Sequence, residues 1–163
     1  MKKKIISLTH GSTATITVTD PSSPLGWSAE IHGVFLDKNI YLTLSGEEIW
    51  RFLCHLIKKA EYYERKYKEY PGVREKEILE KYVPEEYIEL AKELKKKEWE
   101  IYEDRRGEYP IQPGITVSLD PTYSPPIIRF RGNFMGQFFE IRLTDLVDMI
   151  KTAVELVESA KRE

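Results

Sequence analysis

Two stretches of the chain, about 100 residues apart, match each other in the same order. Residues 16–21 (ITVTDP) correspond to residues 115–121 (ITVSLDP), and residues 42–45 (LTLS) correspond to residues 141–144 (IRLT). All the matched passages keep an offset of 99 to 101 residues. A repeat of this length indicates duplication of one structural unit, and two such units are expected to pair in one domain.

Each copy has the pattern of three strands followed by one helix. Apolar and polar residues alternate in the three short runs of each copy, as in half-buried strands, and Pro-containing loops separate the first two runs. Ser45 followed by Glu48 predicts a capping box, and Thr144 is the predicted N-cap of the second helix. An additional strand is expected at residues 4–8. The predicted fold is α+β: two βββα repeats forming antiparallel sheet with helices on one face.

The segment between the copies differs from both of them in composition. Residues 58–108 hold 29 charged residues, 14 basic and 15 acidic, with Tyr, Leu and Ile at helical spacing. This pattern favours an inserted charged helical hairpin over a disordered linker. A short helix is expected near residues 73–82, after Pro71 and Gly72, and a longer one from Pro84 to Gly107. The predicted division is residues 1–60, 61–108 and 109–163.

Composition narrows the class of protein. The chain has 163 residues, a formal net charge of −2 and one cysteine, Cys54, which excludes an intrachain disulfide and a multi-cysteine metal site. No apolar run is long enough to span a bilayer, so a cytoplasmic protein without membrane contact is expected. Lys and Glu are abundant while Asn and Gln total four, which is typical of thermophiles and indicates an archaeal, viral or bacterial thermophilic source.

The sequence contains no recognisable catalytic constellation. Cys54 and His55 are adjacent on a predicted helix and diverge by about 100°, so they do not form a nucleophile–base pair; Cys54 is expected near the core and His55 at the surface. Asp145 and Asp148 are three residues apart at a helix start, where helix-dipole complementarity explains them more simply than a divalent ion. We therefore expect a protein that is not an enzyme and that has no cofactor or metal; an enzyme with a site shared between subunits is left open.

Strict alternation places a set of polar and aromatic residues on the sheet face away from the helices. Arg129, Arg131 and Arg142 share this face in the second copy, and Arg side chains can contact phosphates. Phe138 and Tyr41 are expected to add aromatic surface for stacking on bases, and His32 lies on the same face in the first copy. The pattern predicts binding of single-stranded DNA or RNA. The alternative is an ordinary solvated face of an antiparallel sheet.

One passage resembles a known family. Residues 40–53 (IYLTLSGEEIWRFL) are similar to the passage that closes the sheet and opens the helix in the transcriptional positive cofactor four family. Duplication of such a unit in one chain is similar to the whirly and Pur-alpha proteins. The resemblance implies single-stranded DNA or RNA binding on the open sheet face, with Tyr41 and Lys38 at family-like positions.

A second hypothesis assigns the function to the inserted helices. Seven of the ten Tyr residues fall in this segment, and Tyr is favoured at interfaces because it buries area and keeps a polar tip. The segment could bind a partner protein or make the chain an oligomeric scaffold. A homo-oligomer is expected under either hypothesis.

Overall fold

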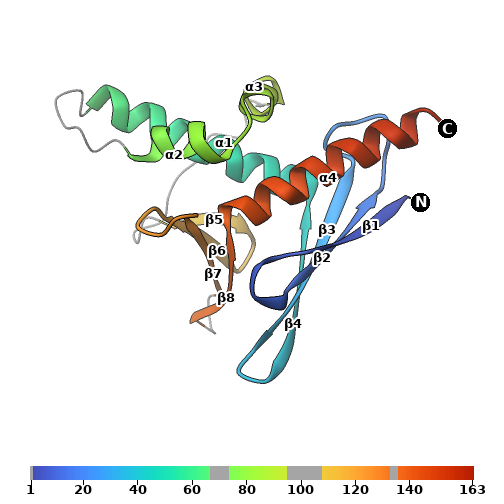
Figure 1. The fold of residues 1–163 in the computed structure, drawn as a ribbon, viewed down its shortest axis with the longest axis horizontal. Helices are drawn as coiled ribbons and strands as arrows, with labels where there is room; N and C mark the ends of the chain where they lie inside the picture. The colour runs from blue at the N-terminus through green and yellow to red at the C-terminus, as the bar shows by residue number, and fades with distance from the viewer. Residues whose placement is uncertain (1, 67–73, 95–107, 133–135) are drawn as a thin grey trace.

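The computed structural model describes residues 2–66, 74–94, 108–132 and 136–163. Within these residues the chain forms two four-stranded antiparallel sheets and four α-helices (Figure 1). In each sheet the strands follow one another in sequence order, β1-β2-β3-β4 and β5-β6-β7-β8. The α+β fold with two repeated units is therefore confirmed.

The two units have the same order of elements. The first consists of β1 (Lys3–Ser7), a short 3-10 turn at Thr9–Gly11, β2 (Thr13–Val18), β3 (Trp27–Phe35), β4 (Lys38–Ser45) and α1 (Gly46–Lys66). The second consists of β5 (Tyr109–Gln112), β6 (Ile115–Asp120), β7 (Ile127–Gly132), β8 (Gly136–Arg142) and α4 (Leu143–Lys161). Each unit is thus a βββα repeat with one further strand in front. The sequence predicted that strand only in the first unit, because β5 contains Pro110 and an irregular register that hide its alternation.

Two shorter helices, α2 (Arg74–Tyr82) and α3 (Glu85–Leu94), lie between the units in sequence. The short helix predicted near residues 73–82 is confirmed as α2, and α3 begins directly after Pro84 as expected. The predicted extension of this helix to Gly107 falls on residues 95–107, outside the described part of the chain. Both helices pack against α1, and the hydrophobic core includes Leu79 of α2, Val83 of the connection, and Tyr87 and Ala91 of α3. The inserted helices are therefore part of the packed body of the protein.

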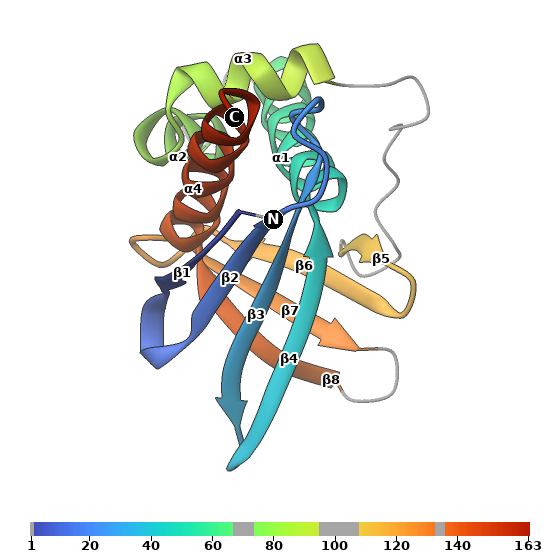
Figure 2. The same ribbon diagram turned by 90° about the vertical axis from the view of Figure 1, so that its right-hand side faces the viewer.

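The helix of each unit packs against its own sheet and also against the sheet of the other unit. Helix α4 packs against β1, β2 and β3 of the first sheet, while α1 reaches β5 of the second sheet. Figure 2 shows the helices together on one side of the two sheets. Phe52 and His55 of α1 stack on the ring of Tyr109 in β5, with ring centroids 5.8 and 4.7 Å away. A single continuous core results, containing residues from both sheets and all four helices.

The starts of α1 and α4 are fixed by different caps. The predicted capping box is confirmed for α1: Glu48 Oε1 accepts the Ser45 N–H at 2.9 Å, and Ser45 Oγ accepts the Glu48 N–H at 3.1 Å. The predicted N-cap Thr144 is wrong, because α4 begins earlier with Arg142 as its N-cap. Asp145 Oδ2 accepts the Arg142 N–H at 2.8 Å, and its Oδ1 accepts the N–H of Thr9 at 3.0 Å. Asp145 therefore joins the start of α4 to the first unit.

The two sheets approach each other closely at Gly33 of β3. A Cβ atom added at Gly33 would lie 2.1 Å from Cε2 of Phe139 in β8, far inside van der Waals contact. Glycine is thus required here by space, since its backbone lets the Phe139 ring lie directly on the strand. The contact is one of the places where β3 and β8 meet.

We expect Gly33→Ala to lower the free energy of unfolding by about 1–3 kcal/mol, the usual cost of overpacking a core. Urea denaturation followed by circular dichroism measures the change. The double variant Gly33→Ala with Phe139→Leu serves as the matched control, because the smaller side chain makes room for the methyl group. A Gly33→Ala protein as stable as the original chain, or effects that simply add in the double variant, would contradict this assignment.

Candidate nucleic-acid interface

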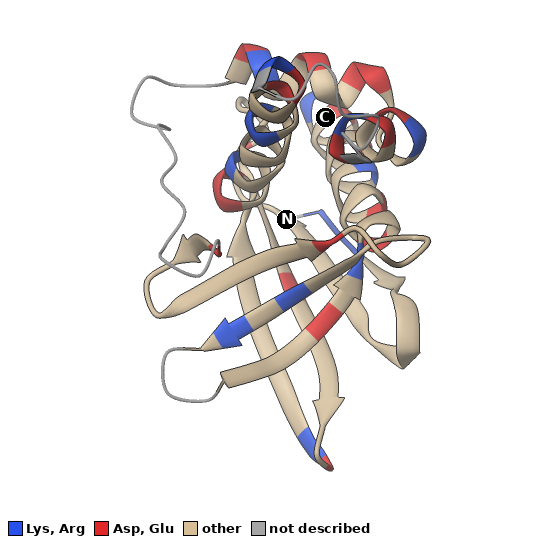
Figure 3. Cartoon of the chain, turned by 90° about the vertical axis from the view of Figure 1, so that its left-hand side faces the viewer, with Lys and Arg blue, Asp and Glu red and all other residues tan. Residues whose placement is uncertain are grey.

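Three arginines lie on the outer face of the second sheet, as alternation predicted. Arg129 and Arg131 are on β7, and Arg142 is the last residue of β8. All three are partly exposed, and Ser118 pairs with Arg129 on the neighbouring strand β6. Figure 3 shows the basic positions of β7 beside an acidic position of β8. The predicted shared face of the three arginines is therefore present.

Carboxylates on the same face already compensate much of this positive charge. Arg129 Nη1 lies 2.6 Å from Asp120 Oδ2, and its Nε lies 3.8 Å from Glu140 Oε2. Arg131 Nε lies 2.9 Å from Glu108 Oε1, while the other oxygen of Glu108 accepts the Thr116 hydroxyl at 2.7 Å. These ion pairs hold two guanidinium groups in fixed positions and reduce their attraction for a phosphate at long range.

Arg142 has a different environment. Its Nη1 donates to the backbone carbonyl of Pro125 at 2.7 Å, in the loop between β6 and β7. The guanidinium carbon of Arg142 lies 5.7 Å from the ring centroid of Tyr123, and that of Arg129 lies 5.6 Å from the same ring. Tyr123 is therefore in cation–π distance of two arginines and is still 46% exposed.

Tyr123 is the functional candidate that the sequence prediction missed. It lies in the Pro-containing loop of residues 121–126, which the alternation of the strands does not describe. The loop is held against the inserted helices, since Tyr82 Oη and Ser124 Oγ are 2.7 Å apart. One signal for Tyr123 was present in the sequence: it is an aromatic residue in the loop just before β7, the strand that carries Arg129 and Arg131. The structure brings together Tyr123, Arg129 and Arg142 as one cluster.

Asp120 anchors this cluster electrostatically. A hydrogen bond from the Thr122 hydroxyl, another from Arg129 and a third from the Thr122 N–H together lower the pKa of Asp120 to about 2. The hydrogen bond to Asp120 in turn raises the pKa of Arg129. The pair is charged at neutral pH, so the position of the Arg129 guanidinium is fixed by an ionised partner.

Two other predicted residues, His32 and Tyr41, form a second group on the first sheet. Tyr41 of β4 is 64% exposed and stacks on His32 of β3, with ring centroids 4.6 Å apart and planes inclined by 19°. His32 Nε2 lies 3.0 Å from Asn39 Oδ1, which orients the imidazole ring. Lys38 is exposed at the start of β4. His32 and Tyr41 thus offer a flat aromatic surface, whereas Lys38 pairs with Phe35 and belongs to the other face of the sheet.

Phe138 does not belong to either group. It was predicted to face outward, but it is only 6% exposed and lies in the hydrophobic core. The register of β7 and β8 shifts between Phe130 and Arg131, so that Phe138 and Phe139 are both buried although they are consecutive. A β-bulge of this kind breaks the alternation on which the prediction rested. Thr116 pairs with Arg131 on the outer face and is buried there beneath Glu108.

Three side chains considered for chemistry have structural roles. Cys54 is buried as predicted, with Sγ 3.8 Å from the carbonyl oxygen of Ala91. The prediction of a surface position for His55 is wrong: it is 7% exposed and stacks on Tyr109. The cause is that α1 is covered by β5 on one side and by α2 and α3 on others. Both Asp145 oxygens accept backbone N–H groups, so its carboxylate has a structural role.

No protein-family model, curated protein or solved structure matches this chain. The resemblance to the transcriptional positive cofactor four, whirly and Pur-alpha proteins therefore stays a prediction. Among the described residues, no helix is both long enough and apolar enough to cross a membrane.

The low pKa of Asp120 predicts a pH dependence of stability. A carboxyl group whose pKa is lower in the folded state stabilises the fold above its unfolded value, near 3.8, and this contribution is lost as the pH falls toward 2. We expect the stability difference between the original chain and Asp120→Asn to be largest above pH 5 and to shrink steadily between about pH 4 and pH 2. Thermal unfolding across this range measures it.

Thr122→Ala is the graded control for this measurement, because it removes the hydroxyl that contributes most to the shift and leaves Arg129 in place. Its stability difference from the original chain should change in the same pH range and by a smaller amount. A difference between the original chain and Asp120→Asn that stays constant with pH would contradict the assigned ion pair.

Proposed function

We propose that this protein is a non-enzymatic single-stranded nucleic-acid-binding protein that uses the outer face of its second sheet. The observation that carries the proposal is the cluster of Tyr123, Arg129 and Arg142, in which two guanidinium groups flank one partly exposed ring. Unpaired bases stack on aromatic rings, and Arg contacts phosphate or stacks on bases through its planar group. The ligand class is single-stranded DNA or RNA.

The charge arrangement favours stacking over electrostatic attraction as the main source of affinity. Asp120, Glu140 and Glu108 face Arg129 and Arg131 on this surface. A base stacked on an aromatic side chain contributes about 1–3 kcal/mol and needs no net positive field. The His32–Tyr41 stack on the first sheet is a second aromatic surface.

Tyr123→Ala should weaken the binding of a fluorescently labelled single-stranded oligonucleotide by about tenfold, because one stacking platform is lost. Fluorescence anisotropy at low salt, with oligo-deoxythymidine and oligo-uridine as the two probes, measures the dissociation constants. Tyr62→Ala is the matched control, since Tyr62 is similarly exposed (49%) but lies on α1. Failure of the original chain to bind either probe, or an equal effect of both substitutions, would rule out the proposed site.

Asp120→Asn should strengthen binding of the same probes, because it removes the closest carboxylate from Arg129 and leaves the guanidinium more available to phosphate. For the original chain, the slope of log affinity against log salt should be shallow, no steeper than about −2 for three phosphate contacts at −0.7 each. The double substitution Arg129→Ala with Arg131→Ala should lower affinity and flatten this slope. If the affinity is unchanged by the substitutions at positions 120, 129 and 131, the ligand does not bind at this face.

A second candidate function is protein interaction through the inserted helices, and one groove favours it. A cavity of about 240 Å³ lies between α1, α2 and α3, with an apolar lining that includes Ile57, Leu79 and Ile88. Five glutamates and two lysines surround these apolar side chains: Glu61, Glu64, Glu80, Glu85, Glu89, Lys76 and Lys92. Each lysine bridges to α1 and to a glutamate on its own helix, which leaves acidic groups in excess. The surface suits a basic amphipathic helix.

A synthetic amphipathic helix with leucine on one face and lysine on the other tests this second function by isothermal titration calorimetry. We expect the double substitution Glu80→Lys with Glu85→Lys to weaken binding at least tenfold through charge repulsion. Glu155→Lys, an exposed position on α4, is the charge-matched control for one of the substitutions. Peptide binding that responds equally to Glu155→Lys would show a non-specific charge effect and exclude the groove.

A further inference from the structure

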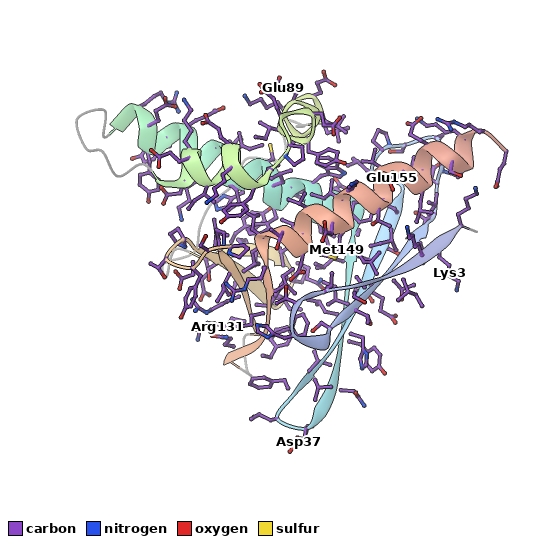
Figure 4. The ribbon with its side chains drawn as sticks, in the orientation of Figure 1. Lys3, Asp37, Glu89, Arg131, Met149 and Glu155 are labelled. Carbon is purple, nitrogen blue, oxygen red and sulfur yellow. The ribbon has the colours of Figure 1, made fainter. Side chains whose placement is uncertain are left out.

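Three consecutive apolar residues stand exposed at the tip of the hairpin formed by β3 and β4. The exposed fractions of Val34, Phe35 and Leu36 are 66%, 37% and 79%. Figure 4 labels the neighbouring Asp37 at the end of this hairpin, far from the helices. A contiguous apolar patch on the surface of a highly charged protein is a marker of an interaction site.

The two residues at the tip of this hairpin have a backbone conformation that is unfavourable for their side chains. Leu36 and Asp37 form a two-residue turn and both have positive φ, 49° and 62°. This combination defines a type I′ turn, in which Asn and Gly are the favoured residues. A branched apolar side chain such as leucine is rare in the left-handed region and costs stability there. Leu36 is thus unfavourable both for its backbone and for its exposure, so the fold alone does not account for it.

A crevice lies next to the tip on the same protomer. Its volume is about 380 Å³, and it runs between the end of β3 and the strand β8. Val34 and Phe35 line it from the hairpin, Phe138 and Phe139 line it from β8, and His10 and Glu140 also contribute. The volume is sufficient for a leucine side chain, and the four apolar residues match its chemistry.

We propose that these two features bind each other between two copies of the chain. The tip of each protomer places Leu36 in the crevice of its partner. The dimer has two-fold symmetry, so the same contact is made twice. The chain itself supports a second copy as the occupant, because it carries both the exposed apolar tip and a crevice of matching size and chemistry. Asp37 and Lys38 offset each other at the tip, and Glu140 in the crevice lies 3.8 Å from Arg129 of its own protomer, so the contact joins two surfaces that carry little net charge. The inference concerns assembly and stands independently of nucleic-acid binding.

Sedimentation equilibrium of the full chain, from low micromolar to millimolar concentration, tests the proposal. We expect a concentration-dependent dimer. The double substitution Leu36→Asn with Asp37→Gly provides the preferred type I′ residues and should raise the dimer dissociation constant by about 100-fold or more, since each dimer loses two buried leucines. The same variant should unfold at an equal or higher temperature under conditions where both chains are monomeric, which separates lost association from lost folding.

Two further variants locate the contact. Ile5→Thr is the matched control, because Ile5 is a similarly exposed apolar residue (68%) on β1, and it should leave the dissociation constant unchanged. Gln137→Trp places a large side chain at an exposed position of the crevice and should weaken the dimer as the tip variant does. A chain that stays monomeric at millimolar concentration, or a dimer that resists the tip and crevice substitutions, would overturn the proposal.

Discussion

The exchange of helices between the two units is the constraint on which the rest of the structure depends. Each sheet packs against the helix of the other unit: α4 lies on the first sheet, and α1 lies against β5 of the second. A four-stranded sheet with one bare apolar face is not stable by itself, so each unit supplies the cover that the other needs. The hydrogen bond that the Thr9 N–H donates to Asp145 and the stacking of His55 on Tyr109 fix this arrangement at two separate places.

The same exchange determines which faces of the two sheets the helices cover. In the described part of the chain, the four helices lie on the inner side, where α2 and α3 complete the cover of α1. The outer faces therefore carry the polar, charged and aromatic residues that alternation directs away from the core. Gly33 lets the two sheets pack closely on Phe139, so the direction of each outer face is fixed by a core contact. The packing of the core therefore determines which sheet faces can serve as candidate binding surfaces.

Much of the fold was predictable because the repeat, the alternation and the caps are local signals. The Ser45–Glu48 box and the short helix before Pro84 were both readable in the sequence. The N-cap of α4 was misplaced by two residues, a local error. The errors at His55 and Phe138 have a different cause, because they depend on long-range packing or on a change of register. His55 is buried by a strand more than 50 residues away, and Phe138 is turned inward by a bulge that no alternation pattern contains. Tyr123 was missed because a loop side chain has no periodicity.

The arginines show why a correct face does not by itself define a binding mode. Alternation placed Arg129 and Arg131 on one surface, and the structure adds the partners Asp120 and Glu108 at 2.6 and 2.9 Å. An unpaired guanidinium attracts phosphate from a distance, whereas a paired one acts mainly as a rigid planar donor at short range. The carboxylates thus offset the arginines on the candidate surface, just as acidic and basic residues nearly cancel over the whole chain. Under the proposed function, stacking on Tyr123 therefore contributes more to the affinity than long-range charge attraction, which is the physical reason to expect weak salt dependence.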